Sequence, residues 1–153
     1  MITGIDLVRE MIRVAGGEPL AFRQEDVAMR GHAIEVRINA EDPAKGFLPA
    51  PGTVSSLRIP GGPGTRFDTM LYQGYQVPPF YDSLLGKLIV WVETRPRAID
   101  RMARALAELE VGGLATTKPL HQLLAGDEAV RAARFHTRWL EPWLERNAGR
   151  LSS

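Results

Sequence analysis

The segment at residues 31–40 carries the side chains of this chain that are best suited to chemistry. Apolar and polar residues alternate along it, which is typical of a β-strand with one apolar and one polar face. Glu35, Arg37 and Asn39 therefore share the polar face. The planar, always charged fork of Arg37 could hold a carboxylate, a bicarbonate or a ureido oxygen and stabilise negative charge there, with Glu35 holding the guanidinium in place. The same pattern also fits a solvated strand face with a surface ion pair.

Other candidate sites fail on spacing. His32, His121 and His136 have no metal-ligand spacing, so we expect structural or surface roles for them. The run Pro60–Gly64 lacks the Gly-Lys-Ser/Thr ending of a phosphate loop, and no helix follows it, so it predicts a turn. Lys87 fits a lysine of lowered pKa or, better, one whose stem covers the core while its amine reaches water. We expect no metal site and no nucleotide site in this chain.

Composition narrows the class of protein. The 153 residues are 44% hydrophobic with a formal net charge of +1, which indicates a folded domain and gives no electrostatic reason to expect nucleic acid or an anionic membrane as partner. The absence of cysteine excludes a disulfide scaffold, a thiolate nucleophile and a cysteine-ligated metal. The longest apolar runs are too short to span a membrane, and the first residues do not resemble a signal peptide. We therefore expect a cytoplasmic location.

The elements that must position the polar face can be predicted from periodicity. A first helix has Thr3 as N-cap, with Asp6 completing a capping-box-like pair, and ends at Gly16-Gly17. Residues 18–30 are mixed, with a turn near 24–26. Strands are predicted at 31–40, 54–59 and 65–71, and a buried central strand at 87–93.

Helices dominate the second half. Thr94 caps a helix that ends at Gly112-Gly113, and shorter helices are predicted at 120–125, 128–134 and 138–145. Trp139 and Trp143 on the last of these could form an interface anchor or, as we favour, pack in the core. The order of helix, short strands and helices predicts an α+β fold, with a small antiparallel β-sheet flanked by helices.

Several motifs resemble one family in the same order along nearly the whole chain. The segment GHAIEVRINAEDP at 31–43 is similar to the start of the C-terminal domain of biotin carboxylases. The resemblance continues through FLPAPG at 47–52, PGGPGTR at 60–66, VPPFYDSLLGKLI at 77–89, TTKPLH at 116–121 and FHTRWLE at 135–141.

This resemblance implies an activity and roles for particular residues. The family carboxylates N1 of biotin, held on a carrier protein, using bicarbonate, ATP and magnesium. Arg37 matches the family's arginine that contacts the ureido group and helps to hold the enolate-like intermediate, so it is our catalytic and biotin-binding candidate. Asp82, like Glu35, is a candidate support of the cleft, and Arg66 is a candidate dimer contact.

The resemblance also implies a division of the chain. Residues 1–18 would form a helix that belongs to the end of the ATP-grasp domain, 19–30 a connector, 31–146 the biotin carboxylase C-terminal domain and 147–153 a tail. The family's ATP- and magnesium-binding parts lie before the matched region, so we expect the isolated chain to be inactive. Its expected partners are the ATP-grasp part of the enzyme, the biotin carboxyl carrier protein and a second copy of itself.

The choice within the family depends on small differences. The segment 81–87 is closer to the biotin carboxylase subunit of bacterial acetyl-CoA carboxylase, which performs the first half-reaction in fatty-acid synthesis. The lack of an Ala-Met-Lys-Met biotin-attachment motif fits a carrier on another polypeptide. The alternatives are the equivalent part of a propionyl-CoA or other acyl-CoA carboxylase, and a non-catalytic module for dimerisation or carrier docking.

Overall fold

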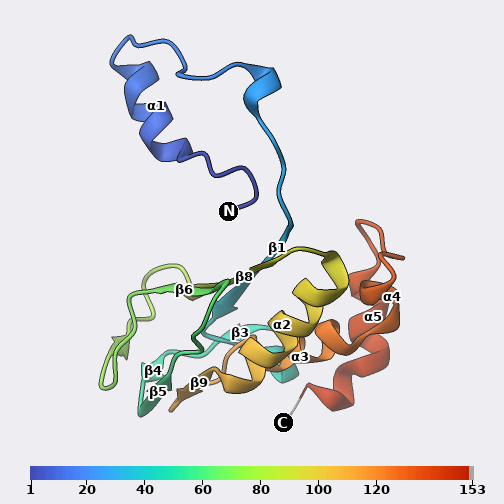
Figure 1. Cartoon of the computed structure of the whole chain (residues 1–153). Helices are drawn as coiled ribbons and strands as arrows, with labels where there is room; N and C mark the ends of the chain where they lie inside the picture. The colour runs from blue at the N-terminus through green and yellow to red at the C-terminus, as the bar shows by residue number, and fades with distance from the viewer. Residues whose placement is uncertain (152–153) are drawn as a thin grey trace.

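A three-stranded antiparallel sheet lies at the centre of the structure, a computed structural model that describes residues 1–151 (Figure 1). Its strands are β1 (His32–Asn39), β8 (Leu84–Val92) and β6 (Thr65–Thr69), in the order β1-β8-β6. The central strand β8 is almost entirely buried, which confirms the predicted core strand. The strand β1 lies at an edge of this sheet.

One face of the sheet packs against helix α2 (Arg95–Glu108). Ile38, Leu88 and Leu106 are fully buried where the sheet and the helix meet. The helix forms because Pro96 occupies its first turn and its apolar residues recur at helical spacing. Thr94 is the N-cap as predicted, but its side chain makes no capping hydrogen bond. The helix ends at Glu108, earlier than predicted.

Further helices cover the edge of the sheet beside β1. They are α3 (Lys118–Gly126), α4 (Glu128–Arg131) and α5 (Leu140–Asn147). Separate 3₁₀ turns lie at Gln24–Asp26, Pro43–Lys45 and Ala148–Arg150. Trp143 is 3% exposed and packs with Leu120 and Leu151, and its indole N–H donates to the Asp127 carboxylate at 2.7 Å. Trp143 is therefore a core residue and not an interface anchor.

Three pairs of very short strands complete the α+β fold. They are β2 (Glu41–Asp42) with β3 (Leu48–Pro49), β4 (Gly52–Thr53) with β7 (Gln76–Val77), and β5 (Ser56–Arg58) with β9 (Glu110–Gly112). Most of them were not predicted, because two or three residues are too few to show a period of two. The predicted small antiparallel sheet flanked by helices is confirmed.

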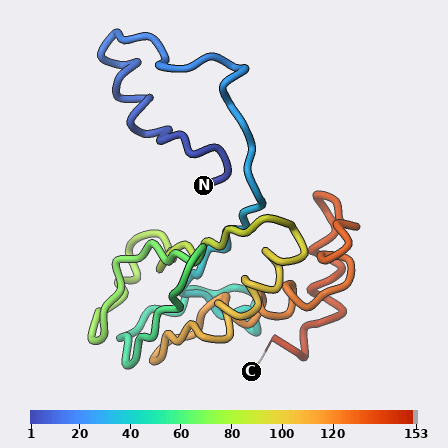
Figure 2. Tube along the Cα trace, viewed as in Figure 1, coloured from blue at the N-terminus to red at the C-terminus, as the bar shows by residue number. Residues whose placement is uncertain are grey.

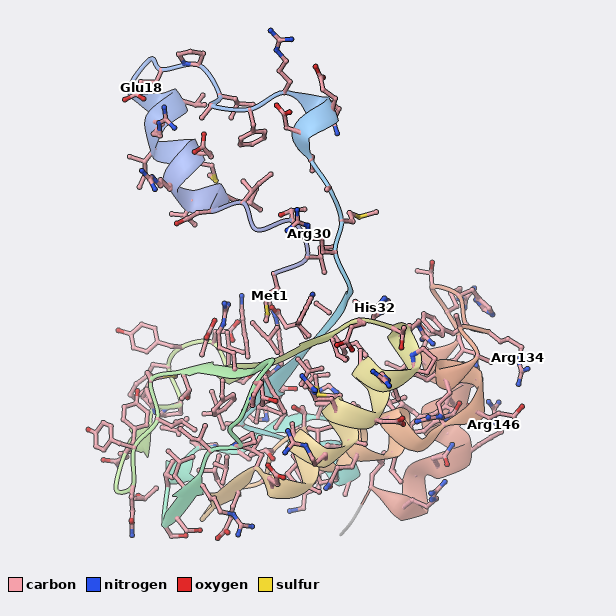
Figure 3. All side chains as sticks on the ribbon, viewed as in Figure 1. Met1, Glu18, Arg30, His32, Arg134 and Arg146 are labelled. Carbon is pink, nitrogen blue, oxygen red and sulfur yellow. The ribbon has the colours of Figure 1, made fainter. Side chains whose placement is uncertain are left out.

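Residues 1–30 project away from the rest of the molecule (Figure 2). In Figure 3, Glu18 lies at the far end of this segment, while Arg134 and Arg146 lie on the helical side of the main body. Helix α1 (Leu7–Ala15) begins with Asp6 as its cap, since the Asp6 carboxylate accepts from the Arg9 amide at 3.0 Å. The predicted cap at Thr3 was wrong.

The apolar stripe of α1 is uncovered in the described part of the chain. The exposed side chains are Leu7, Val8, Met11 and Ile12, and the helix has no buried residue. None of the helices within residues 1–151 is long and apolar enough to cross a membrane.

The burial of the central sheet gives a stability prediction. Leu88→Ala should lower the free energy of unfolding by about 2–5 kcal/mol, because it removes a fully buried side chain and leaves a cavity. The matched change Leu7→Ala, at a side chain 68% exposed on α1, should alter it by no more than about 0.5 kcal/mol. Urea denaturation of both variants measures the difference; equal effects would contradict this assignment of the core.

Candidate functional site

The other face of the central sheet carries the predicted polar residues. In an antiparallel sheet, residues directly opposite each other point to the same side. Arg37 on β1 lies opposite Lys87 on β8, and Lys87 in turn lies opposite Asp68 on β6. In the next row, Glu35 and Arg66 flank Ile89. Five charged side chains thus share this surface: Glu35, Arg37, Arg66, Asp68 and Lys87.

Arg37 and Lys87 lie side by side without a counter-charge of their own. Asp68, which could have paired with Lys87, forms an ion pair with Arg66 at 2.8 Å. Among residues 1–151, neither the guanidinium of Arg37 nor the amine of Lys87 makes an ion pair or a hydrogen bond. Like charges at directly opposed positions of a sheet repel each other. A bound anion would relieve this repulsion and accept charge-assisted hydrogen bonds from both side chains.

The predicted support of Arg37 by Glu35 is not found within the described residues. Within residues 1–151, Glu35 is exposed to solvent and forms no ion pair with Arg37, whereas Arg66 and Asp68, at the same spacing on β6, pair at 2.8 Å. Lys87 was not among the site residues predicted from the sequence. It is the one basic residue within an otherwise apolar strand, but only the register of β8 against β1 places it beside Arg37.

Asp82 lies outside the row of charged side chains. It belongs to the loop before β8, where its exposed carboxylate accepts a hydrogen bond from the Leu84 amide at 2.7 Å. In the described part of the chain it forms no hydrogen bond or ion pair with Arg37 or Lys87. The observed contact shapes the start of β8.

A hydrogen-bonded group follows the end of β1. The register shifts between Ile38 and Asn39, so that Asn39 lies opposite Leu84. The side-chain amide of Asn39 donates to the Glu41 carboxylate at 3.2 Å, and the Ser83 hydroxyl donates to the same carboxylate oxygen. The side-chain oxygen of Asn39 is buried and has no partner within residues 1–151. Glu41 therefore serves to tie the loop before β8 to the end of β1.

The backbone of Arg37 is held from the α3 side. The Thr117 hydroxyl donates to the backbone carbonyl of Arg37 at 3.0 Å and accepts from the backbone amide of Asn39 at 3.0 Å. The backbone amide of Thr117 donates to the backbone carbonyl of Asn39 at 3.1 Å. The His121 Nε2 lies 2.8 Å from the same Arg37 carbonyl. Because a carbonyl can only accept, Nε2 carries the proton.

The surroundings of His121 favour its neutral form. Burial lowers its pKa, and the hydrogen bond to the Arg37 carbonyl opposes that shift only in part. With His136 it lines an otherwise apolar cavity of about 300 Å³ beside β1. No group of three or more histidine, aspartate or glutamate residues in the described chain is placed to hold a metal ion.

Comparison with known proteins identifies relatives of this chain. Residues 35–142 match the family model of the biotin carboxylase C-terminal domain. The biotin carboxylase of Nostoc is 57% identical over 122 residues, and the biotin carboxylase of Haemophilus influenzae is 50% identical over 147 residues. These alignments cover 80% and 96% of this chain, but only 27% and 33% of the relatives.

A solved structure extends the similarity to the fold. The biotin carboxylase domain of the Hydrogenobacter thermophilus 2-oxoglutarate carboxylase, a dimer in complex with MgADP, ADP and bicarbonate, superimposes with a TM-score of 0.91 at 44% identity. The match covers all of this chain and 33% of that one. The match to the family model and the shared fold together show that this chain belongs to the biotin carboxylase C-terminal domain family.

Proposed function

We propose that this chain is the C-terminal part of a biotin carboxylase, the ATP-dependent ligase that carboxylates N1 of carrier-bound biotin with bicarbonate. The observation that carries the proposal is the pair of adjacent cations, Arg37 and Lys87, which have no ion pair or hydrogen bond within residues 1–151 and lie on the exposed face of the sheet. Arg37 is the catalytic and biotin-binding residue of this proposal. The family relationship supports the choice of substrate.

The chemistry of Arg37 follows from its charge and shape. When N1 of biotin loses its proton, negative charge spreads onto the ureido oxygen. The planar guanidinium can donate two hydrogen bonds to that oxygen or to a bicarbonate, and these bonds strengthen as charge develops. Lys87 adds a second positive charge beside it. Asp82, in the loop before β8, stays a proposed support of the cleft.

The described residues do not fit the magnesium that the family requires, because they offer no cluster of carboxylates for the cation. We derive no step of ATP cleavage from this chain and assign it to the ATP-grasp part of the enzyme. The uncovered apolar stripe of α1 supports the assignment of residues 1–18 to that part.

Two finer assignments belong to the same proposal. The form of residues 81–87 supports acetyl-CoA carboxylase, and therefore fatty-acid synthesis, as the system that this chain serves. A homodimer is supported by the dimeric relative, with Arg66 on the exposed face as a contact and a separate biotin carboxyl carrier protein as partner.

The division of labour gives the first functional prediction. The 153-residue chain alone should release no phosphate from ATP, whereas a mixture with a separately expressed ATP-grasp part should hydrolyse ATP in a biotin-dependent manner. Arg37→Ala should abolish this activity in the mixture, and the control Arg58→Ala, at an exposed arginine of β5, should retain it. A phosphate-release assay measures all four.

Three outcomes would count against the proposal. Phosphate release by the chain alone would contradict the assignment of ATP cleavage to the other part. An active mixture with Arg37→Ala would contradict the role of Arg37. Two fragments that bind each other yet remain inactive would favour a non-catalytic module for dimerisation or carrier docking.

The second prediction concerns Arg66. Arg66→Glu should shift the assembled enzyme from dimer to monomer in sedimentation-velocity experiments, because it places a second carboxylate beside Asp68. Arg58→Ala again serves as the control on a different surface. An Arg66→Glu enzyme that remains fully dimeric at micromolar concentration would rule out this contact.

A further inference from the structure

We propose that Thr117 and His121 are positioning residues that hold Arg37 in place through its backbone. This inference rests on the proposed catalytic role of Arg37. It assigns a task to the residue that caps the start of α3 and to one side chain within that helix, both about eighty positions away from Arg37 along the chain.

The guanidinium of Arg37 is not held by polar partners of its own in the described part of the chain. Within residues 1–151 the Arg37 side chain has no ion pair and no hydrogen bond. No neighbouring side chain therefore fixes it by a polar contact. The place from which it can reach a ligand is set by the position and tilt of the β1 backbone at residue 37.

The backbone of Arg37 lies at an edge of the sheet. As an edge strand, β1 pairs with β8 on one side only, and its other edge presents carbonyls and amides without strand partners. Directly after Arg37 the register shifts between Ile38 and Asn39, so the ladder to β8 is irregular there. The backbone at this point needs support from outside the sheet.

Thr117 supplies this support across the irregular position. Its single hydroxyl bonds Arg37 on one side and Asn39 on the other, at 3.0 Å each. The side chain is only 5% exposed, so water does not easily replace it. His121, one helical turn further along α3, donates a second hydrogen bond to the Arg37 carbonyl. Both lone pairs of that carbonyl are then used.

Catalysis by Arg37 should be sensitive to this support. A displacement of about 1 Å in a substrate-contacting group can reduce a rate about a hundredfold. Thr117→Val removes the hydroxyl at nearly constant shape, and Thr117→Ser restores it. Thr116→Val is the matched control, since Thr116 is a neighbouring buried threonine whose hydroxyl accepts only from the Lys118 amide.

The experiment uses the complete enzyme, assembled from this chain and the ATP-grasp part. We expect Thr117→Val to reduce kcat/KM for biotin at least about tenfold, Thr117→Ser to recover most of it, and Thr116→Val to leave it near the unsubstituted value. In an Arg37→Lys background, where some activity remains, Thr117→Val should have a smaller effect than in the unsubstituted enzyme, because its role acts through Arg37. His121→Phe should behave like Thr117→Val.

A second readout does not depend on activity. In the 153-residue chain, hydrogen exchange at the Asn39 amide should be faster in Thr117→Val than in Thr116→Val, since only the first loses the acceptor of that N–H. Unchanged exchange in a folded Thr117→Val chain would overturn the proposed contact.

The outcomes separate the two proposals. Full activity of Thr117→Val and His121→Phe, with Arg37→Ala inactive, would overturn the positioning role and leave the proposed function intact. Full activity of Arg37→Ala would overturn the proposed function, and the positioning role with it. A loss with Thr117→Val that persists undiminished in the Arg37→Lys background would overturn the positioning role and show that Thr117 acts on general stability instead.

Discussion

The alternation of apolar and charged residues along β1 is the constraint on which the site depends. Ile38 is fully buried against the core, so the strand cannot slip by one residue without moving Arg37 into the interior. Because the apolar face of β1 is buried, the charged side chains between its apolar residues must point to the opposite face. The same logic applies to β8, where buried Leu88 alternates with Lys87. Hydrophobic packing on one side of the sheet thus brings two cations together on the opposite side.

This arrangement has a stability cost that the fold tolerates. Two adjacent cations that repel each other contribute less to folding stability than an ion pair at the same positions would. Such departures from local stability tend to occur at functional sites. Asp68 could have neutralised Lys87 but pairs with Arg66. Support for this part of β1 comes through its backbone, because Thr117 and His121 form hydrogen bonds with the Arg37 carbonyl at the outer edge of the strand. Support of the main chain leaves the guanidinium free to bind.

The parts of this account that could be predicted from sequence are those with a local signal. The period of two at 31–40 predicts Arg37 on a polar face, and the apolar run predicts the central strand. The proximity of Lys87 to Arg37 depends on register, and the contact of Thr117 with Arg37 joins segments 80 residues apart. No local pattern encodes either. Glu35 shows the opposite case: its shared face with Arg37 predicts an ion pair, but none forms within residues 1–151, although Arg66 and Asp68 at the same spacing on β6 do pair.

The central claim is that the guanidinium of Arg37 binds the ureido group during carboxylation. Its most direct test is the transfer of labelled bicarbonate to biotin by the assembled enzyme, compared with Arg37→Lys, which keeps the charge and loses the planar fork. The account predicts a loss of labelled carboxybiotin of about a hundredfold or more. Carboxybiotin formation at the unsubstituted rate by this variant, and by Arg37→Ala, would contradict it.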